Sequence, residues 1–271
     1  MNDRQLLDSH AITPKKSLGQ NFLHDPNTLE KIVEIADLSP DTIVLEVGPG
    51  TGNLTRILAR EAKRVIAVEL DERLMPLLQK QLADYPNVEL VHADILAVKI
   101  ADLVGAQPFT VVANVPYYIT SAILRHLLES IPHPRRIVVT VQLEVAERMV
   151  ATPGDMSLLA VSVQYYGYPQ LALRLNPAVF WPRPDVDSAV VRIDSSDRPT
   201  VEVPDEHLFF RVVRAGFGQK RKQLRNSLSA GLHIDKNRAD TLLSQAGIES
   251  QRRAETLSLD EWAALTRVVA G

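Results

Sequence analysis

The 271-residue chain contains no cysteine. It therefore lacks a disulfide framework, an iron–sulfur cluster, a thiolate metal site and a cysteine nucleophile. No apolar run reaches the roughly 18 residues that a membrane-spanning helix needs. Residues 1–10 are polar and carry charges of both signs, unlike a secretory signal. We therefore expect a soluble, cytoplasmic protein that uses no metal and no membrane.

A strong net charge is also missing, since 30 Lys and Arg face 33 Asp and Glu for a net charge of −3. The average hides an asymmetry, because residues 198–271 hold 12 basic and 9 acidic side chains and the rest of the chain is net acidic. Residues 211–225 contain six cations and no acid: Arg211, Arg214, Lys220, Arg221, Lys222 and Arg225. Such asymmetry favours a nucleic-acid partner, although a solvated helix face explains the charges more simply.

The first half of the chain alternates β-rich runs with helical patterns, which is typical of a parallel sheet flanked by helices. We predict a doubly wound, Rossmann-like α/β fold. Helices are expected at about 53–61, 72–82 and 121–130. Strands are expected at 43–47, 64–69, 88–92, 109–113 and 136–142.

Prolines accumulate between residues 168 and 198. Because proline is disfavoured inside central strands and helices, we expect short edge strands there, with 189–193 the best candidate. Beyond Pro204 the pattern predicts only helices, at 206–217, 222–230, 236–245 and 259–269. We therefore predict a domain over 1–200 and a small all-helical domain over 201–271.

A glycine-rich turn follows the first predicted strand and contains Gly48, Gly50 and Gly52. A side chain at such a turn would keep a ligand away from the backbone N–H groups. The dinucleotide fingerprint needs its third glycine at position 53, where this chain has Asn53. Glu69, at the end of the next strand, is placed to accept hydrogen bonds from both hydroxyls of a ribose. Since this turn has no pyrophosphate to hold, S-adenosylmethionine suits it; a tight turn with a capping glutamate is the alternative.

Asp94 and Ile95 follow the third predicted strand. There Asp94 can accept a hydrogen bond from an adenine amino group while Ile95 packs on the ring, although an aspartate at such a position can equally cap a helix. Gly48, Glu69 and Asp94 follow three successive strands, at the edge where open α/β sheets bind ligands. That coincidence favours a nucleoside site.

Asn114, Val115, Pro116 and Tyr117 follow the fourth predicted strand. Methylation of an exocyclic amine requires its delocalised lone pair to be turned toward the methyl group. The Asn114 side-chain carbonyl and a backbone carbonyl beside the proline can accept both N–H bonds, since Pro116 biases Val115 to an extended shape. Tyr117 offers a flat face for the base. A simple strand-ending turn is the alternative.

With these motifs in order, the chain resembles the ribosomal RNA adenine N6-dimethyltransferases, most closely those that modify two adjacent adenosines near the 3′ end of small-subunit rRNA. The resemblance runs from Lys15 to about Leu228. It implies S-adenosylmethionine as cofactor, contacted by Asn21 and Leu23 of an N-terminal signature and by Asn114. It implies that Phe180 lies against the target base and that the cations of 211–225 begin an RNA-binding domain. The substrate would be rRNA within a pre-ribosomal particle, and we expect a monomer.

The chain departs from the family pattern where Leu158-Leu159-Ala160 replaces an aromatic-Gly-Arg step and Leu143 replaces a usual lysine. These changes remove two positive charges from the expected RNA side. Three alternatives stay open: a large-subunit rRNA adenine methylase of the antibiotic-resistance type, a non-catalytic ribosome-assembly factor, and a nicotinamide oxidoreductase. Asn53 and the Asn-Val-Pro-Tyr segment disfavour the last of these.

Overall fold

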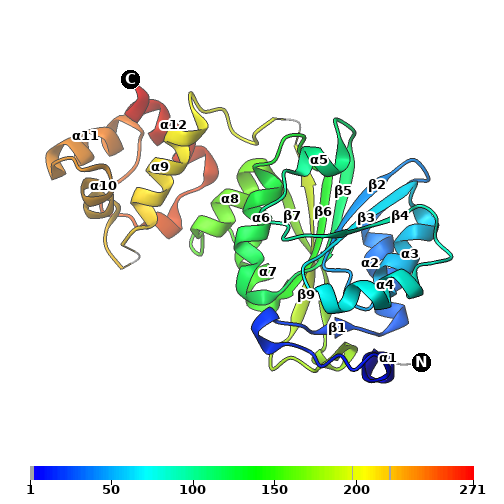
Figure 1. Ribbon diagram of the computed structural model, residues 1–271. Coiled ribbons are helices and arrows are strands. Elements are labelled where there is room, and N and C mark those ends of the chain that lie inside the picture. The colour runs from blue at the N-terminus through cyan, green and yellow to red at the C-terminus, as the bar shows by residue number, and fades with distance from the viewer. Residues whose placement is uncertain (1–2, 197, 220) are drawn as a thin grey trace. The chain divides into compact units, whose positions relative to one another are not determined.

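The computed structural model describes residues 3–196, 198–219 and 221–271. The chain divides into two compact units (Figure 1). We call Met1–Ala146 with Pro169–Asp197 the sheet unit, and Glu147–Tyr168 with Arg198–Gly271 the helical unit. The helical unit thus takes a segment from the middle of the chain as well as the C-terminal helices. The division of function between residues 1–200 and 201–271 stays a prediction.

A seven-stranded sheet forms the centre of the sheet unit, in the order β4-β3-β2-β5-β6-β9-β7. Strands β4, β3, β2, β5 and β6 pair in parallel, and β9 pairs antiparallel to β6. The predicted α/β fold and its five parallel strands are confirmed. The bounds are β2 (Ile43–Val47), β3 (Arg64–Glu69), β4 (Val88–His92), β5 (Phe109–Asn114), β6 (Arg136–Gln142), β7 (Gly167–Leu175) and β9 (Ser188–Ser195).

The prediction of an edge strand at 189–193 is wrong. Strand β9 lies between β6 and β7, inside the sheet. Pro182 and Pro184 precede the strand and therefore remove no hydrogen bond from its ladder. The edge position belongs to β7, which contains Pro169 and has an alternating pattern of exposure.

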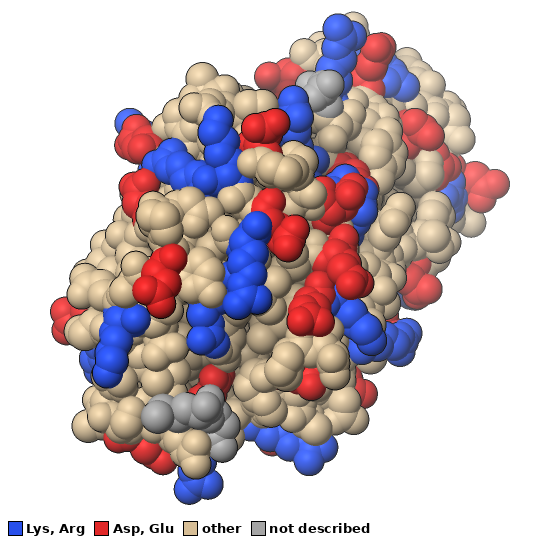
Figure 2. All heavy atoms as spheres, turned by 90° about the vertical axis from the view of Figure 1, so that its right-hand side faces the viewer, with Lys and Arg blue, Asp and Glu red and all other residues tan. Residues whose placement is uncertain are grey.

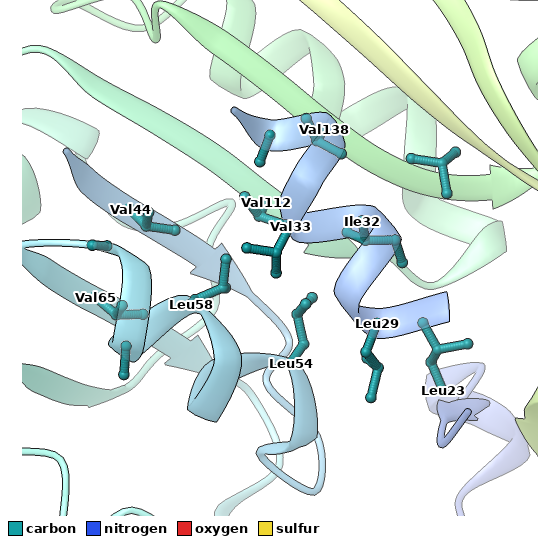
Figure 3. Packing of buried hydrophobic residues seen from close by; sticks show 14 of the residues in the cluster. Leu23, Leu29, Ile32, Val33, Val44, Leu54, Leu58, Val65, Val112 and Val138 are labelled. Atoms are coloured by element: carbon teal, nitrogen blue, oxygen red, sulfur yellow. The ribbon is translucent and has the colours of Figure 1, made fainter. Parts of the chain in front are cut away.

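Two helices, α2 (Pro26–Ala36) and α3 (Asn53–Glu61), supply apolar side chains to one core cluster (Figure 3). Helix α2 begins at a strong cap, since the Asp25 carboxylate accepts the Thr28 N–H at 2.8 Å. The sheet contributes one buried valine from each of five neighbouring strands: Val44, Val65, Val112, Val138 and Val190. This cluster fixes the strand ends on which the site is built.

Shorter helices complete the sheet unit: α1 (Asp3–Ser9), α4 (Met75–Gln81), α5 (Ile100–Val104), α6 (Thr120–Leu128) and the 3₁₀ turn η3 (Tyr117–Ile119). The unit boundary falls within α7 (Leu143–Met149). A second sheet of two strands joins distant segments, because β1 (Phe22–Leu23) pairs antiparallel with β8 (Phe180–Trp181). Two parts of the chain that match family signatures thus lie side by side.

The helical unit is built from α8 (Leu158–Tyr166), α9 (Glu206–Phe217), α10 (Leu224–Leu232), α11 (Lys236–Gln245) and α12 (Leu259–Ala270). The four C-terminal helices agree with the predicted ones, whereas α8 was not predicted. Its Tyr165 ring stacks on Phe209 of α9 with centroids 4.8 Å apart. Of the residues that depart from the family pattern, Leu159 and Ala160 are buried in the core here, whereas Leu158 is exposed. No helix in the described ranges is long and apolar enough to cross a bilayer.

Candidate active site

One cavity, open to solvent, lies at the carboxyl ends of β2, β3, β4 and β5, and its volume is about 800 Å³ when its solvent-open part is included. This is the edge at which open parallel sheets bind ligands. The N-terminal segment 18–22 and the turn η3 close its sides. The cavity brings together most of the predicted site residues: Asn21, Gly48, Gly50, Glu69, Asp94, Ile95, Asn114, Val115, Pro116 and Tyr117.

Two glycines of the glycine turn, Gly48 and Gly50, line the cavity. Gly48 and Gly50 have φ of +73° and +59°, in the left-handed region that other residues adopt at a cost. A Cβ added to Gly50 would come within 2.9 Å of the Phe22 ring. Residue 50 therefore has room for backbone only, and its N–H donates to Glu69 Oε2 at 3.2 Å.

Glu69 ends strand β3 with a buried carboxylate on the cavity. Its Oε1 accepts the Asp71 N–H at 2.8 Å, while Gly50 contacts the other oxygen. Burial raises the pKa of Glu69, and the hydrogen bonds from the Asp71 and Gly50 N–H groups oppose that rise. These contacts hold the acid at the strand end where a ribose hydroxyl pair would require it.

Asp94 and Ile95 follow strand β4 with opposite surroundings. Asp94 is exposed and its Oδ1 accepts the Leu96 N–H at 2.9 Å, while Ile95 is buried. This hydrogen bond closes a turn, so Asp94 does not cap a helix here. An exposed carboxylate beside a buried aliphatic side chain fits the edge and face of an adenine.

Asn114 is held by the N-terminal segment. Its Nδ2 donates to the Asn21 backbone carbonyl at 3.0 Å, and the Asn21 side chain in turn donates to the Gly19 carbonyl at 3.2 Å. No described residue donates a hydrogen bond to Asn114 Oδ1. The amide is therefore oriented with its carbonyl oxygen left as the acceptor, a geometry set by a residue 93 positions away in the chain.

The residues after Asn114 form a rigid turn. The Pro116 carbonyl accepts the Ile119 N–H and the Thr120 hydroxyl, each at 3.2 Å. The Tyr117 hydroxyl and Ser188 Oγ are 2.7 Å apart, and burial raises the pKa of Tyr117. Since the Pro116 carbonyl is occupied, the Val115 carbonyl is the remaining backbone candidate to accept a substrate N–H.

A set of hydrogen bonds that was not predicted holds the N-terminal segment at the cavity. We call these contacts of Gln20, Asp71 and Arg73 the latch. Gln20 Nε2 donates to Asp71 Oδ2 at 2.8 Å, and Gln20 Oε1 accepts the Lys15 N–H. Arg73 donates to Asp71 and also to the Thr13 carbonyl. These contacts with Arg73 and Gln20 lower the pKa of Asp71 to about 2. Gln20 and Asp71 both lie within segments that match family signatures, and this match is the sequence feature that could have indicated their role.

Two predicted site residues lie outside this cavity. Phe180 is buried in the same core cluster as Leu23, its partner across the β1–β8 pair. Side chains alternate along a strand, and Trp181 packs on a different cluster, so Phe180 faces the core. The described conformation thus does not bring Phe180 to the cavity. Leu23 lines a smaller neighbouring hollow, which shares Gly48, Gly50 and Asn114 with the cavity.

The predicted RNA-binding cations belong to the helical unit. Arg211 and Arg214 are exposed on α9 beside a hollow that His207 and Leu208 also line. Three further cations follow: Arg221 and Lys222 are exposed, and Arg225 bonds to Asp240 at 3.0 Å. Lys220 lies outside the described residues. On the face that Figure 2 presents, basic and acidic side chains are interspersed.

Metal ligands do not gather anywhere in the described ranges, which contain no group of three or more His, Asp or Glu side chains able to hold an ion. The cavity instead offers two carboxylates, three side-chain amides, backbone N–H groups and apolar walls. These groups match the hydroxyls, amines and ring of a nucleoside. The donor set therefore fits S-adenosylmethionine.

A doubly wound sheet whose glycine turn, ribose acid and Asn-Val-Pro-Tyr segment share one cavity defines an S-adenosylmethionine-dependent methyltransferase. A family model described as ribosomal RNA adenine dimethylase matches residues 12–270. The chain belongs to this family. It is an enzyme that methylates adenine in ribosomal RNA.

Individual relatives agree with the family. A protein of Dehalococcoides mccartyi named ribosomal RNA small subunit methyltransferase A is 45% identical over 98% of this chain and 91% of its own. A protein of the same name from Anoxybacillus flavithermus is 44% identical, covering 97% and 92%. Among solved structures, the 23S rRNA methyltransferase ErmE is 31% identical with a TM-score of 0.74, covering 93% of this chain and 100% of that one. A dimethyladenosine transferase from Plasmodium falciparum is 26% identical with a TM-score of 0.77, covering 90% and 95%.

Proposed function

We infer that the enzyme dimethylates N6 of two adjacent adenosines near the 3′ end of small-subunit rRNA, within a cytoplasmic pre-ribosomal particle, and acts as a monomer. The names and identities of the small-subunit relatives support the choice of subunit. The Asn114–Asn21 hydrogen bond is the observation that carries the chemistry, because it orients an amide acceptor beside the cofactor residues.

In this proposal the chain's own residues position the amine. Asn114 Oδ1 and the Val115 carbonyl accept the two N6 hydrogens, which localises the nitrogen lone pair. Tyr117, fixed through Ser188, lies beside the base. When bound, S-adenosylmethionine supplies the electrophilic methyl group. Rate then comes from orientation rather than from a base or a metal.

Glu69, Asp94 and Ile95 would hold the nucleoside part of the cofactor, and the Gly48–Gly50 backbone and Asn21 the amino-acid part. Leu23 would need to contact the cofactor from the smaller neighbouring hollow. Phe180 would need to contact the target base from the core in which it is buried. Arg211, Arg214, Arg221 and Lys222, with Lys220 and Arg225, would contact rRNA phosphates.

The test is transfer from labelled S-adenosylmethionine to separately purified small and large subunits that lack the modification, with the product adenosines mapped. We expect label at two adjacent adenosines of the small subunit only. Label on the large subunit would support the antibiotic-resistance type instead. Cofactor binding without transfer to either subunit would support an assembly factor.

A further inference from the structure

Tyr118 places an aromatic ring in solvent at the wall of the active-site cavity. It lines the cavity with Tyr117, yet it is 58% exposed whereas Tyr117 is half-buried. Single exposed aromatic side chains are common on protein surfaces and need no explanation by themselves. Tyr118 differs from such residues in its position at the cavity wall and in the contacts that hold it in place.

The backbone beneath Tyr118 is fixed. It is the middle residue of η3, which the Ile119 N–H closes on Pro116 and which the buried Thr120 hydroxyl braces against Pro116 and Tyr117. Two consecutive tyrosines therefore have different surroundings, one tied by its hydroxyl to Ser188 and one presenting its ring outward.

Gly19 supports the ring from the N-terminal segment. A Cβ at residue 19 would lie 3.3 Å from Tyr118 Cδ1 and 3.4 Å from Cε1, so the ring rests against the bare glycine backbone. Gly19 also has a positive φ of +59°, and its carbonyl accepts the Asn21 side chain. The Tyr118 ring is thus seated on the same segment that orients Asn114.

We propose that Tyr118 is a stacking platform for the base next to the target adenine. The inference rests on the proposed function and adds a second nucleotide to it. Tyr118 follows Tyr117 directly, and consecutive Cα atoms are only about 3.8 Å apart, so the two rings can serve successive nucleotides of one strand. Enzymes that act on an extruded base commonly take their sequence context from the flanking nucleotides. Stacking suits this task because every base has a flat face.

The ring, and not the hydroxyl, is the feature that matters. No described residue forms a hydrogen bond with the Tyr118 hydroxyl. Tyr118→Phe should therefore keep the platform, Tyr118→Leu should keep only apolar area, and Tyr118→Ala should lose both. Tyr168 is a matched control, because it is 59% exposed in β7 and is not a lining residue of the cavity.

The experiment measures kcat and KM for unmodified small subunits, and the Kd for S-adenosylmethionine, in these four variants. Tyr118→Ala should raise the KM for subunits by about 5- to 150-fold, the range that loss of one stacked base produces. Its cofactor Kd should stay at the wild-type value. Tyr118→Phe and Tyr168→Ala should match the wild type, with Tyr118→Leu between.

An unchanged KM in Tyr118→Ala, or an equal loss in Tyr118→Phe, would overturn the platform while leaving the proposed function intact. An equal loss of cofactor affinity in Tyr118→Ala would also overturn it, since the defect would then lie in the cofactor site. Absence of transfer by the wild-type chain to small subunits would overturn the proposed function, and this inference with it.

Discussion

The sheet unit and the helical unit hold their polar groups in opposite ways. In the sheet unit, Glu69 and Asn114 are each fixed by hydrogen bonds with backbone groups from distant parts of the chain. In the helical unit, Arg211, Arg214 and Arg221 are exposed. Fixed groups suit a reaction in which small displacements cost rate, whereas exposed cations suit a flexible polyanion. A single substitution at a fixed group of the sheet unit should therefore cause a large loss of function. Each substitution of an exposed cation in the helical unit should weaken RNA binding by a small step.

Among the effects on ligand binding that sharpen this comparison, the largest is expected at Gly50. Gly50→Ala places a Cβ at a φ of +59° and 2.9 Å from Phe22, so the glycine turn must shift. We expect affinity for S-adenosylmethionine to fall roughly 100-fold, as strain of about 3 kcal/mol would produce. Equilibrium dialysis measures it. Gly105→Ala has a similar φ of +66° with nothing within 4 Å, and should bind cofactor normally; equal losses in both variants would break the explanation.

Small, stepwise effects on rRNA binding are expected at the exposed arginines of α9. The double variant Arg211→Gln/Arg214→Gln should weaken rRNA binding and reduce the slope of log K against log salt concentration by about 1.4, at about 0.7 per single-strand phosphate contact. Cofactor affinity should not change. Filter binding over a salt series measures the slope, with the exposed Arg238→Gln on α11 as control. A slope equal to that of the wild type would remove these arginines from the RNA surface.

A smaller effect is expected at the latch. Gln20→Ala removes the hydrogen bond to the buried Asp71 carboxylate and loosens the segment that carries Asn21. We expect KM for S-adenosylmethionine to rise about 5- to 10-fold, a net cost of about 1 kcal/mol for losing the hydrogen bonds of Gln20 with Asp71 and Lys15. Gln81→Ala, whose side chain contacts Arg56 away from the cavity, is the control. A KM for S-adenosylmethionine equal to that of the wild type would contradict a positioning role for Gln20.

A further effect concerns stability rather than binding. Burial raises the pKa of Glu46 to about 8, and its Oε2 has no hydrogen-bond partner among the described residues. The unfolded chain ionises this group above about pH 4.5, so its contribution to stability falls as pH rises from there to about 8. In the absence of cofactor, the Tm of Glu46→Gln should exceed the Tm of the wild type by a larger margin at pH 8 than at pH 5. Thermal denaturation at both pH values tests this, and a pH-independent difference would contradict it.

Much of the sheet unit could be predicted because local signals and tertiary structure agree there. The parallel strands are apolar runs between turns, and the glycine turn, Glu69, Asp94 and Asn114 follow strands whose carboxyl ends must meet. The edge position predicted for β9 is wrong because prolines indicate where a chain cannot form ladder hydrogen bonds. They do not indicate which strands a segment pairs with.

The rest depends on contacts between residues far apart in the chain. Nothing local indicates that Gln20 reaches Asp71, or that Asn21 orients Asn114 across 93 positions. The burial of Phe180 likewise follows from its pairing with Leu23. In the helical unit, α10 continues past the predicted end at residue 230 and includes Gly231, where α9 passes so close that a Cβ would meet Ala215 at 2.5 Å.

The central claim is that Asn114 acts by orienting the amine and not by holding the cofactor. The most direct test compares Asn114→Ala with the wild type in methyl transfer to unmodified small subunits and in equilibrium binding of S-adenosylmethionine. We predict that transfer falls by about 10³-fold while the cofactor Kd stays near its wild-type value. Transfer at a near wild-type rate, or a loss of cofactor binding that accounts for the whole defect, would contradict the account.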